Sequence, residues 1–389
     1  MDYDVVVVGA GPGGTMTAKT LAESGVSVLV VEKRPEIGVP VRCGEATGIK
    51  GLKNLGIKPD AKFIATETRG SYIYAPDGTK VDIRTEKSNG YVLERGMFDK
   101  CLAISAARAG AVIRTRTYAT GLVKEDGCVK GVVLKHFNEE HEVRCNVVVG
   151  ADGVEGKIGR WAGINTRTKL AEMASNVQFE MAGIDIEEPD VLEFYLGDNY
   201  APGGYVWIFP KSEDVANVGL GIRASKETAL HYLKKFIASR DDLKKGSIVG
   251  MVAGGVSVQG PLERSVADGV VLVGDAARHV DPLTGGGIYN AMYCGTLAGK
   301  TIKEALDEGN FSESFLKKYH EWWWKDIGEG LMRSLRIKEM LDKLSDNDIN
   351  EIAKFMQDLK LRDIDIKDAS GGALTFPPEF TAFVQSLLQ

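Results

Sequence analysis

Short, continuous apolar runs separated by a helical pattern mark the start of the chain. Residues 4–8, "DVVVV", and residues 26–32, "VSVLVVE", flank apolar positions with helical spacing that end at Gly25. Such runs are typical of strands buried on both faces of a parallel sheet, and glycine is a common helix C-cap. The pattern therefore predicts a strand, a helix and a second strand, which together form one βαβ unit.

The pattern changes further along the chain. Residues 71–94 alternate around a "PDG" turn, residues 171–259 favour antiparallel strands, and helical periodicity dominates from residue 288. These patterns predict an α/β fold with a Rossmann-like domain, an antiparallel β-sheet substrate domain and a helical C-terminal region. The expected bounds are 1–70, 95–170 and 260–300 for the discontinuous Rossmann-like domain, 71–94 and 171–259 for the sheet domain, and 301–389 for the helical domain.

Charge and cysteine usage narrow the class of protein. The formal net charge is −6 and no basic tract is interleaved with aromatic residues, so nucleic acid is not an expected partner. The 5 cysteines are scattered without a C-x-x-C pair, which indicates neither a metal site nor a disulfide framework. No apolar run approaches the ~18 residues that span a bilayer. We therefore expect a cytoplasmic protein, with peripheral contact at a membrane left open.

A glycine fingerprint follows the first predicted strand. Gly9, Gly11 and Gly14 form a G-x-G-x-x-G motif that opens the predicted helix, and Glu32 ends the second strand. The glycines permit a tight turn and close approach to a pyrophosphate at the helix N-terminus, while the carboxylate accepts hydrogen bonds from ribose hydroxyls. This context predicts a dinucleotide site, and the acidic residue disfavours a 2′-phosphate there.

Two later motifs identify the dinucleotide. Asp275 and Gly287 in "GDAARHVDPLTGGGI" resemble the second flavin-contacting motif of the aromatic-hydroxylase superfamily, and Asp152 in "GADG" resembles its third. The resemblance implies FAD, with Asp275 on the ribityl oxygens. A helix that begins near Gly287 would direct its N–H groups toward the flavin ring. The alternative for Asp275 is a simple helix cap.

Within that superfamily the chain resembles the geranylgeranyl reductase family, in particular its digeranylgeranylglycerophospholipid reductases of archaeal lipid biosynthesis. The matching segments are "VRCGEATG", "YVLERGMFDKCLA", "GYVWIFPKSEDVANVGLG" and "GDAARHVDPLTGGGI". The third also faintly resembles a signature of flavin-dependent halogenases. The family resemblance implies FAD contacts at Thr15, Glu32, Cys43, Gly44, Ala46, Arg95, Ala119, Asp275, Gly287 and Ile288. Arg95, and with less support Arg42, would pair with cofactor phosphates, unless they form surface ion pairs.

Three aromatic residues and one cysteine are the candidates closest to the chemistry. Tyr205, Trp207 and Phe209 alternate, so on a strand they share one face, either as ordinary core or as an apolar wall over the flavin. Cys43 is interpreted as a cavity wall beside the flavin or lipid, as a proton donor, or as simple packing. Tyr205 and His279 are further candidates for the catalytic proton, and a structural hydrogen bond is the alternative for His279.

The C-terminal helices are expected to supply the substrate entrance. Trp322, Trp323 and Trp324 occupy every side of a helix, which favours burial or an interface. Arg333, Arg336 and Lys338 would bind a phosphate headgroup, against the alternative of a solvated basic face.

The resulting prediction is an FAD-dependent reductase that saturates the double bonds of geranylgeranyl chains in glycerophospholipids by hydride transfer from flavin N5. No second G-x-G-x-x-G follows a strand, so the reductant is expected to be external: NAD(P)H, ferredoxin or a similar carrier. The alternatives are a flavin monooxygenase acting on an aromatic or quinone-like substrate and a non-catalytic prenyl-lipid carrier that retains flavin.

Overall fold

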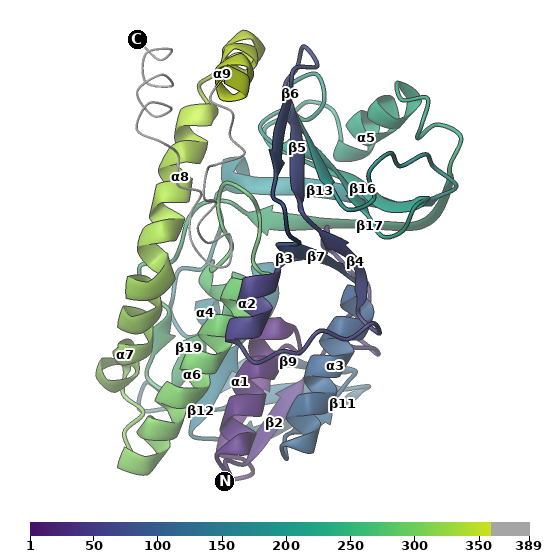
Figure 1. The fold of residues 1–389 in the computed structure, drawn as a ribbon. Coiled ribbons are helices and arrows are strands. Elements are labelled where there is room, and N and C mark those ends of the chain that lie inside the picture. The colour runs from purple at the N-terminus through teal and green to yellow at the C-terminus, as the bar shows by residue number, and fades with distance from the viewer. Residues whose placement is uncertain (359–389) are drawn as a thin grey trace. The chain divides into compact units, whose positions relative to one another are not determined.

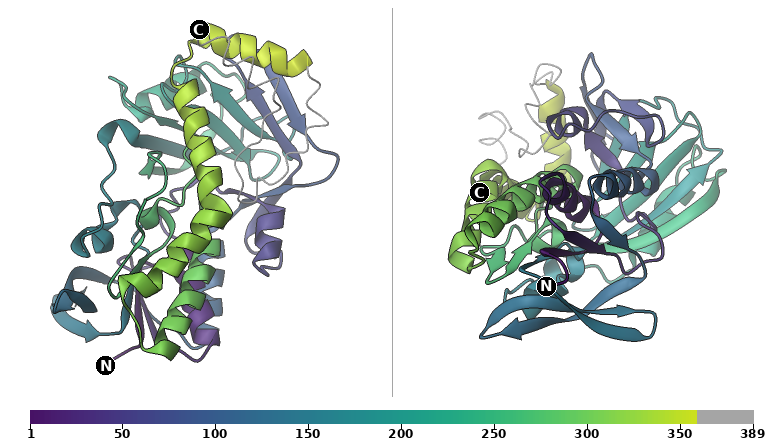
Figure 2. Two further views of the ribbon diagram at one scale, coloured as in Figure 1. Left: turned by 90° about the vertical axis from the view of Figure 1, so that its left-hand side faces the viewer. Right: turned by 90° about the horizontal axis from the view of Figure 1, so that it is seen from below.

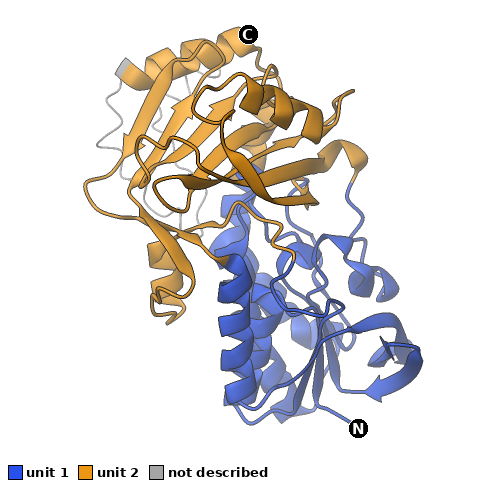
Figure 3. Ribbon diagram, turned by 90° about the vertical axis from the view of Figure 1, so that its right-hand side faces the viewer, with its two compact units in different colours: residues 1–39, 95–168, 259–333 blue, residues 40–94, 169–258, 334–389 orange. Residues whose placement is uncertain are grey.

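The computed structural model describes residues 1–358 and divides the chain into two compact units (Figure 3). Unit 1 comprises residues 1–39, 95–168 and 259–333, and unit 2 comprises residues 40–94, 169–258 and those from 334 onward. The predicted α/β class is confirmed: a Rossmann-like sheet lies in unit 1, and a large, mainly antiparallel sheet lies in unit 2.

Unit 1 is built on a sheet of six strands, of which all but one are parallel to their neighbours. The predicted strand at residues 4–8 forms over Val5–Val8, and all four valines are buried. Alternate valines face opposite sides: Val5 and Val7 belong to one core cluster, Val6 and Val8 to the other. The order across the sheet is β18 (Val266–Ala267), β19 (Val270–Leu272), β12 (Val147–Gly150), β1 (Val5–Val8), β2 (Val28–Val31) and β8 (Val112–Arg114).

Helices cover one face of this sheet and a small antiparallel sheet covers the other, as Figures 1 and 2 show. The helices are α1 (Pro12–Glu23), α3 (Arg95–Arg108), α6 (Ile288–Glu308) and α7 (Glu313–Trp323). The opposite layer contains β9 (Thr117–Glu125), β10 (Cys128–His136), β11 (Glu139–Arg144) and α4 (Lys157–Trp161). Short helical turns occur at Gly153–Glu155, Gly274–Ala277 and Trp324–Gly328, the last with π-helical pairing.

Unit 2 contains a seven-stranded sheet, antiparallel except where β14 pairs with β5. One face packs on helix α5 (Ala229–Ala238), whose apolar side includes Leu233 and Phe236. The predicted hairpin around "PDG" forms its β5–β6 edge. The order across the sheet is β17 (Ser247–Ser257), β13 (Met173–Ala182), β16 (Val215–Ile222), β15 (Tyr205–Pro210), β14 (Leu192–Leu196), β5 (Gly70–Tyr74) and β6 (Lys80–Arg84).

A second, three-stranded sheet in unit 2 holds the segment that follows Cys43. Its strands are β3 (Ala46–Gly48), β7 (Gly90–Leu93) and β4 (Ile64–Thr68), with β7 in the centre. The remaining helical elements of the described chain are α2 (Ile49–Asn54), the turn Leu170–Glu172, α8 (Glu329–Leu341), whose first residues belong to unit 1, and α9 (Asp346–Asp358).

The two units divide the chain differently from the three predicted domains. Residues 40–70 were expected in the Rossmann-like domain, but β3 and β4 pair with β7 and therefore belong to unit 2. Residues 301–333 pack with unit 1, because Leu316, Tyr319 and Trp323 of α7 join the core of its sheet. The described C-terminal helices thus extend both units, and the part of the predicted helical domain beyond residue 358 lies outside the described residues.

Among residues 1–358, no helix is both long enough and apolar enough to span a membrane.

Candidate functional site

The glycine loop of unit 1 leaves room for a ligand at one position and is crowded at the others. A Cβ on Gly9 would lie 2.2 Å from the Ala151 carbonyl oxygen, and a Cβ on Gly14 would lie 2.0 Å from the Gly9 carbonyl oxygen. A Cβ on Gly11 would meet nothing within 4 Å. Gly11 is the N-cap of α1, so the open space adjoins the unpaired N–H groups of a helix N-terminus. This arrangement suits a pyrophosphate.

Thr15 is buried in the first turn of α1, and its side chain is hydrogen-bonded to backbone oxygens there. Its hydroxyl donates to the Gly11 carbonyl oxygen at 2.9 Å, and its backbone N–H donates to the same oxygen at 3.0 Å. The residue is 1% exposed. Thr15 therefore stabilises the first turn of α1.

Glu32 lies beside the glycine loop, as the spacing predicted. One carboxylate oxygen accepts the Ala10 N–H at 3.1 Å and the other accepts the Arg34 N–H at 3.0 Å. Each oxygen retains lone pairs for further donors. The carboxylate is thus held in a fixed position, from which it can accept ribose hydroxyls.

Asp152 follows β12 and begins a short helix. Its Oδ2 accepts the backbone N–H groups of Lys157 and Ile158, at 2.5 and 3.0 Å. Its Oδ1 is buried and has no hydrogen-bond partner within the described part of the chain, and burial raises the pKa of the carboxyl. A buried oxygen without a partner is uncommon and indicates a place where a ligand group can donate.

Asp275 lies against the start of α6. A Cβ on Gly287, the N-cap of that helix, would be 3.6 Å from the Asp275 Oδ1. Burial raises the pKa of the Asp275 carboxyl, and the charge of Arg95 opposes this shift. Because β1, β12 and β19 run parallel, the residues that follow them gather at one edge of the sheet. The structure therefore brings the three sequence motifs together in unit 1.

The other residues that were predicted to contact the cofactor are divided between the two units. Arg95 forms a bidentate pair with Asp99, with both N–O distances at 2.9 Å, and the side chains are 14% and 7% exposed. Ala119 lies on β9 in unit 1. Arg42 is exposed in unit 2, where Ala46 begins β3.

The aromatic stripe of unit 2 lies on the sheet face opposite α5. Trp207 and Phe209 are 9% and 7% exposed, and their rings are tilted against each other. Trp207 also makes an edge contact with Tyr205, and Phe209 makes one with Phe194. The Trp207 Nε1–H donates to the Gln178 side-chain oxygen at 2.9 Å. The indole lies over Gly219 of the neighbouring strand, where a Cβ would be only 2.5 Å from it. Glycine at that position thus makes room for the tryptophan.

The Cys43–Gly44 segment packs against this stripe. A Cβ on Gly44 would lie 2.7 Å from the Phe209 ring and 3.5 Å from the Trp207 Nε1. The half-buried Cys43 Sγ accepts the Glu45 backbone N–H at 3.2 Å. Two motifs more than 150 residues apart therefore meet within unit 2.

A buried charged cluster that the sequence analysis missed adjoins the same segment. Glu45 and Lys211 have side chains 3% and 7% exposed and pair at 2.9 Å, and Asn217 donates to the same Glu45 oxygen at 2.6 Å. We call Glu45, Lys211 and Asn217 the Glu45 clamp. Burial lowers the pKa of Lys211, but the charge of Glu45 and hydrogen bonds to Glu45 and Glu94 outweigh it, so the pKa is raised. A signal was present, because Lys211 continues the period-two spacing of the aromatic stripe.

His279 is unsuited to proton donation. It is fully buried in unit 1, its Nδ1 accepts the Gly274 N–H at 3.2 Å, and its ring centroid lies 4.6 Å from that of Trp323. Burial lowers its pKa to about 3. The imidazole is therefore neutral near pH 7, and the structural alternative is favoured.

The C-terminal cations do not form one group. Arg333 and Arg336 are exposed on α8, whereas Lys338 is 5% exposed and ion-paired with Glu172 and Asp342. Lys338 is therefore not available for a phosphate headgroup. Of the three tryptophans, Trp323 is fully buried and donates to Ser265, while Trp322 is 39% exposed.

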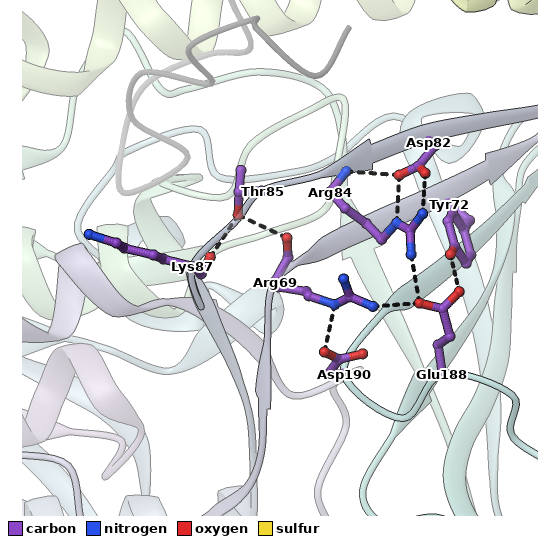
Figure 4. Close-up of polar contacts among 8 residues, drawn as sticks. All are labelled: Arg69, Tyr72, Asp82, Arg84, Thr85, Lys87, Glu188 and Asp190. Atoms are coloured by element: carbon purple, nitrogen blue, oxygen red, sulfur yellow. Dashed lines mark hydrogen bonds and ion pairs between the residues drawn. The ribbon is translucent and has the colours of Figure 1, made fainter. Parts of the chain in front are cut away.

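A further ion network ties the β5–β6 hairpin to the loop before β14 (Figure 4). Glu188 accepts from Arg69 at 2.6 Å and Arg84 at 2.7 Å, and also from the Tyr72 hydroxyl. Asp82 and Asp190 pair with the same arginines. The arginines are a quarter to a third exposed, so this network is much closer to solvent than the Glu45 clamp.

Comparison with known proteins identifies the class first. A Rossmann-like NAD(P)-binding domain family matches residues 7–55. A flavin-dependent brominase shares the fold, with a TM-score of 0.69 at 20% identity over 99% of this chain and 98% of its own. Together with the glycine loop, these findings define a protein with a Rossmann-like dinucleotide-binding domain and the fold of this brominase.

The particular family follows from closer matches. The geranylgeranyl reductase catalytic domain family matches residues 172–256. The digeranylgeranylglycerophospholipid reductase of Methanothrix thermoacetophila is 47% identical over 377 residues, 95% of each chain. A crystal structure of a geranylgeranyl bacteriochlorophyll reductase-like protein from Thermoplasma acidophilum has a TM-score of 0.89 at 38% identity, covering 99% of this chain and 96% of that one. This chain belongs to the geranylgeranyl reductase family, and the resemblance drawn from its sequence is confirmed.

Proposed function

We propose that the protein is an FAD-dependent reductase that saturates the carbon–carbon double bonds of geranylgeranyl chains in digeranylgeranylglycerophospholipids. The observation that carries this proposal is the packing of the Cys43–Gly44 segment against Trp207 and Phe209. The aromatic residues lie within the part of the chain that matches the reductase catalytic domain family. Near full-length similarity to a named digeranylgeranylglycerophospholipid reductase supports the lipid class.

The residues of unit 1 suit FAD. The open side of Gly11 would admit the pyrophosphate, Glu32 would accept adenosine ribose hydroxyls, and Asp275 beside the α6 N-terminus would hold the ribityl chain. The buried Oδ1 of Asp152 would accept a donor from the cofactor or an ordered water. When bound, the flavin supplies a hydride and is reduced again by an external donor. Cys43, Gly44 and Ala46 remain proposed contacts, as do Arg42 and Ala119.

The protein must assist hydride transfer to an isolated alkene. Such a bond is a poor hydride acceptor, so catalysis depends on positioning, exclusion of water and a proton for the second carbon. We assign the apolar wall to Tyr205, Trp207 and Phe209. The proton donor is then Cys43, Tyr205 or a bound water, because His279 carries no acidic proton near pH 7.

The exposed cations Arg333 and Arg336 stay as proposed contacts for the phosphate headgroup. A guanidinium group suits a phosphate, and neither side chain is buried. Peripheral contact with a bilayer and an NAD(P)H or ferredoxin-like donor complete the proposal.

Mass spectrometry of the lipid product tests this function. The purified holoprotein, a geranylgeranyl glycerophospholipid and dithionite, incubated without oxygen, should yield products that gain two hydrogens for each double bond reduced. Cys43→Ala should retain FAD but change the rate or extent of saturation, whereas the half-buried Cys101→Ala should not. Unchanged lipid together with oxygen-dependent hydroxylation of an aromatic substrate would favour the monooxygenase instead. A bound flavin that no lipid reoxidises would favour the carrier.

A further inference from the structure

One peptide unit links Cys43 to the Glu45 clamp. The Gly44 carbonyl oxygen accepts the Asn217 side-chain amide at 3.3 Å, and the Glu45 N–H on the other side of the same peptide bond donates to the Cys43 Sγ at 3.2 Å. Because a peptide unit is planar, a donor that fixes the carbonyl also fixes the direction of the N–H. Asn217 therefore acts on the geometry at the sulfur through the Gly44–Glu45 peptide unit.

Glu45 holds this peptide in an unfavourable backbone conformation. Its φ is +78°, a region that non-glycine residues rarely adopt. Its carboxylate is held by Asn217 at 2.6 Å and Lys211 at 2.9 Å, and its carbonyl oxygen accepts the Leu93 N–H at 2.9 Å. Strained residues persist where their surroundings over-determine them, and they gather at functional sites.

The charges around the Glu45 clamp help to hold the Glu45 carboxylate in place. Lys211 also contacts Glu94 at 2.9 Å and Glu180 at 3.8 Å, with those carboxylates 47% and 40% exposed. A lysine among three carboxylates keeps its proton, so it serves as a permanent counter-charge for Glu45. Arg42, next to the cysteine in sequence, extends along Gly254 and is exposed.

We infer that Glu45 is a positioning residue for Cys43: the Glu45 clamp orients the Gly44–Glu45 peptide so that its N–H supports the sulfur, most strongly as the thiolate. The Glu45 N–H contacts the sulfur, while Gly44 packs against the Phe209 ring. The consequence for catalysis rests on the proposed function, whereas the effect on the thiol itself does not.

The test is the pH dependence of Cys43 alkylation in the holoprotein, followed by mass spectrometry of the peptide that carries it. Glu45→Gly is the main variant, because glycine adopts a positive φ without strain and so preserves the fold while it removes the carboxylate anchor. We expect the midpoint of the pH profile to rise by about half to one pH unit, which is about a three- to tenfold lower alkylation rate near neutral pH. Glu45→Gln, whose amide oxygen still accepts from Asn217, should restore most of the wild-type profile.

A second variant and a control keep the outcome interpretable. Asn217→Ala removes both amide hydrogen bonds and should shift the midpoint in the same direction. Arg223→Met is the control, because Arg223 is an 11% exposed cation of the same unit that pairs with Asp342 and Glu172. It should leave the midpoint unchanged.

The inference is overturned if Glu45→Gly retains flavin and its melting temperature but gives the wild-type alkylation profile. It is also overturned if Arg223→Met shifts the midpoint equally. Lipid saturation, measured on the same samples, reports separately on the proposed function: a shifted thiol supports the positioning role even where no lipid is reduced.

Discussion

Gly9 beside the proposed pyrophosphate site in unit 1 and Glu45 beside Cys43 in unit 2 both adopt a positive φ, but they are held there by opposite means. At Gly9, with φ +107°, the absence of a side chain is essential, because a Cβ would lie 2.2 Å from the Ala151 carbonyl oxygen. At Glu45, with φ +78°, a charged side chain offsets the strain through Lys211 and Asn217. The glycine loop of unit 1 thus depends on close backbone packing, whereas the Glu45 clamp of unit 2 depends on buried side chains.

The largest expected effect is at Gly9. Gly9→Val places a branched side chain into backbone atoms at a φ that suits only glycine. We therefore expect the free energy of unfolding to fall by about 3 kcal/mol or more. We also expect the variant to lose its flavin. Urea unfolding and the visible absorbance of the purified protein measure both.

Gly11→Val is the matched variant. Its Cβ would meet nothing within 4 Å and its φ of −72° suits any residue, so the stability of the flavin-free protein should change by no more than about 0.5 kcal/mol. Flavin affinity should still fall, because the side chain occupies the space proposed for the pyrophosphate. Wild-type flavin affinity in Gly11→Val would contradict this assignment.

Lys211→Met tests the side-chain-built site. It leaves the 3% exposed Glu45 carboxylate without its ion-pair partner, and we expect a loss of about 3 kcal/mol in the free energy of unfolding. Lys245→Met, which breaks an ion pair between side chains 52% and 68% exposed, should cost less than about 1 kcal/mol.

The raised pKa of Lys211 predicts the pH range in which this lysine stabilises the folded state. Because the pKa of Lys211 is raised in the folded state, the stability that its charge contributes is fully present below the unfolded pKa of about 10.4. This stability is lost as pH rises through the folded pKa. The difference in stability between wild type and Lys211→Met should therefore persist to about pH 10 and shrink above it. Loss of the difference near pH 7 would contradict this assignment.

The sequence was informative where structure follows from local spacing. The apolar run at Val5–Val8, the glycine loop and the period-two aromatic stripe each predicted an element or a face from a few neighbouring residues. It was uninformative where a side chain's environment depends on distant partners. Lys338 was expected to bind a phosphate headgroup, but it is buried against Glu172, 166 residues away. No local pattern indicates that Glu45 is buried or that its φ is positive, because both depend on Lys211 and Asn217.

His279 is buried as a neutral ring, in contrast to the buried charges of the Glu45 clamp in unit 2. Burial lowers its pKa to about 3, below the unfolded value of 6.5. Its contribution to stability is therefore complete above pH 6.5 and is lost as pH falls toward 3, by about 1.4 kcal/mol for each pH unit. His279→Asn, whose amide oxygen can accept the Gly274 N–H, should lose about 2 kcal/mol less than wild type between pH 7 and pH 4.5. It should also still reduce the lipid, and abolished turnover with flavin retained would restore His279 as a catalytic candidate.

The smallest effect is expected at Glu188, whose carboxylate has several partners, Arg69, Arg84 and Tyr72, but lies nearer to solvent than that of Glu45. Its side chain is 26% exposed, and the hydrogen bond from Tyr72, followed by the charges of Arg84 and Arg69, lowers its pKa despite partial burial. The stability that the Glu188 carboxylate contributes is therefore fully present above the unfolded pKa of about 4.3 and is lost as pH falls through the lower folded pKa. Glu188→Gln should reduce the free energy of unfolding by about 1 kcal/mol or less at pH 7, and the difference should shrink toward pH 3. If the loss instead equals that of Lys211→Met, then the number of partners, rather than burial, decides how strongly a charged cluster stabilises unit 2.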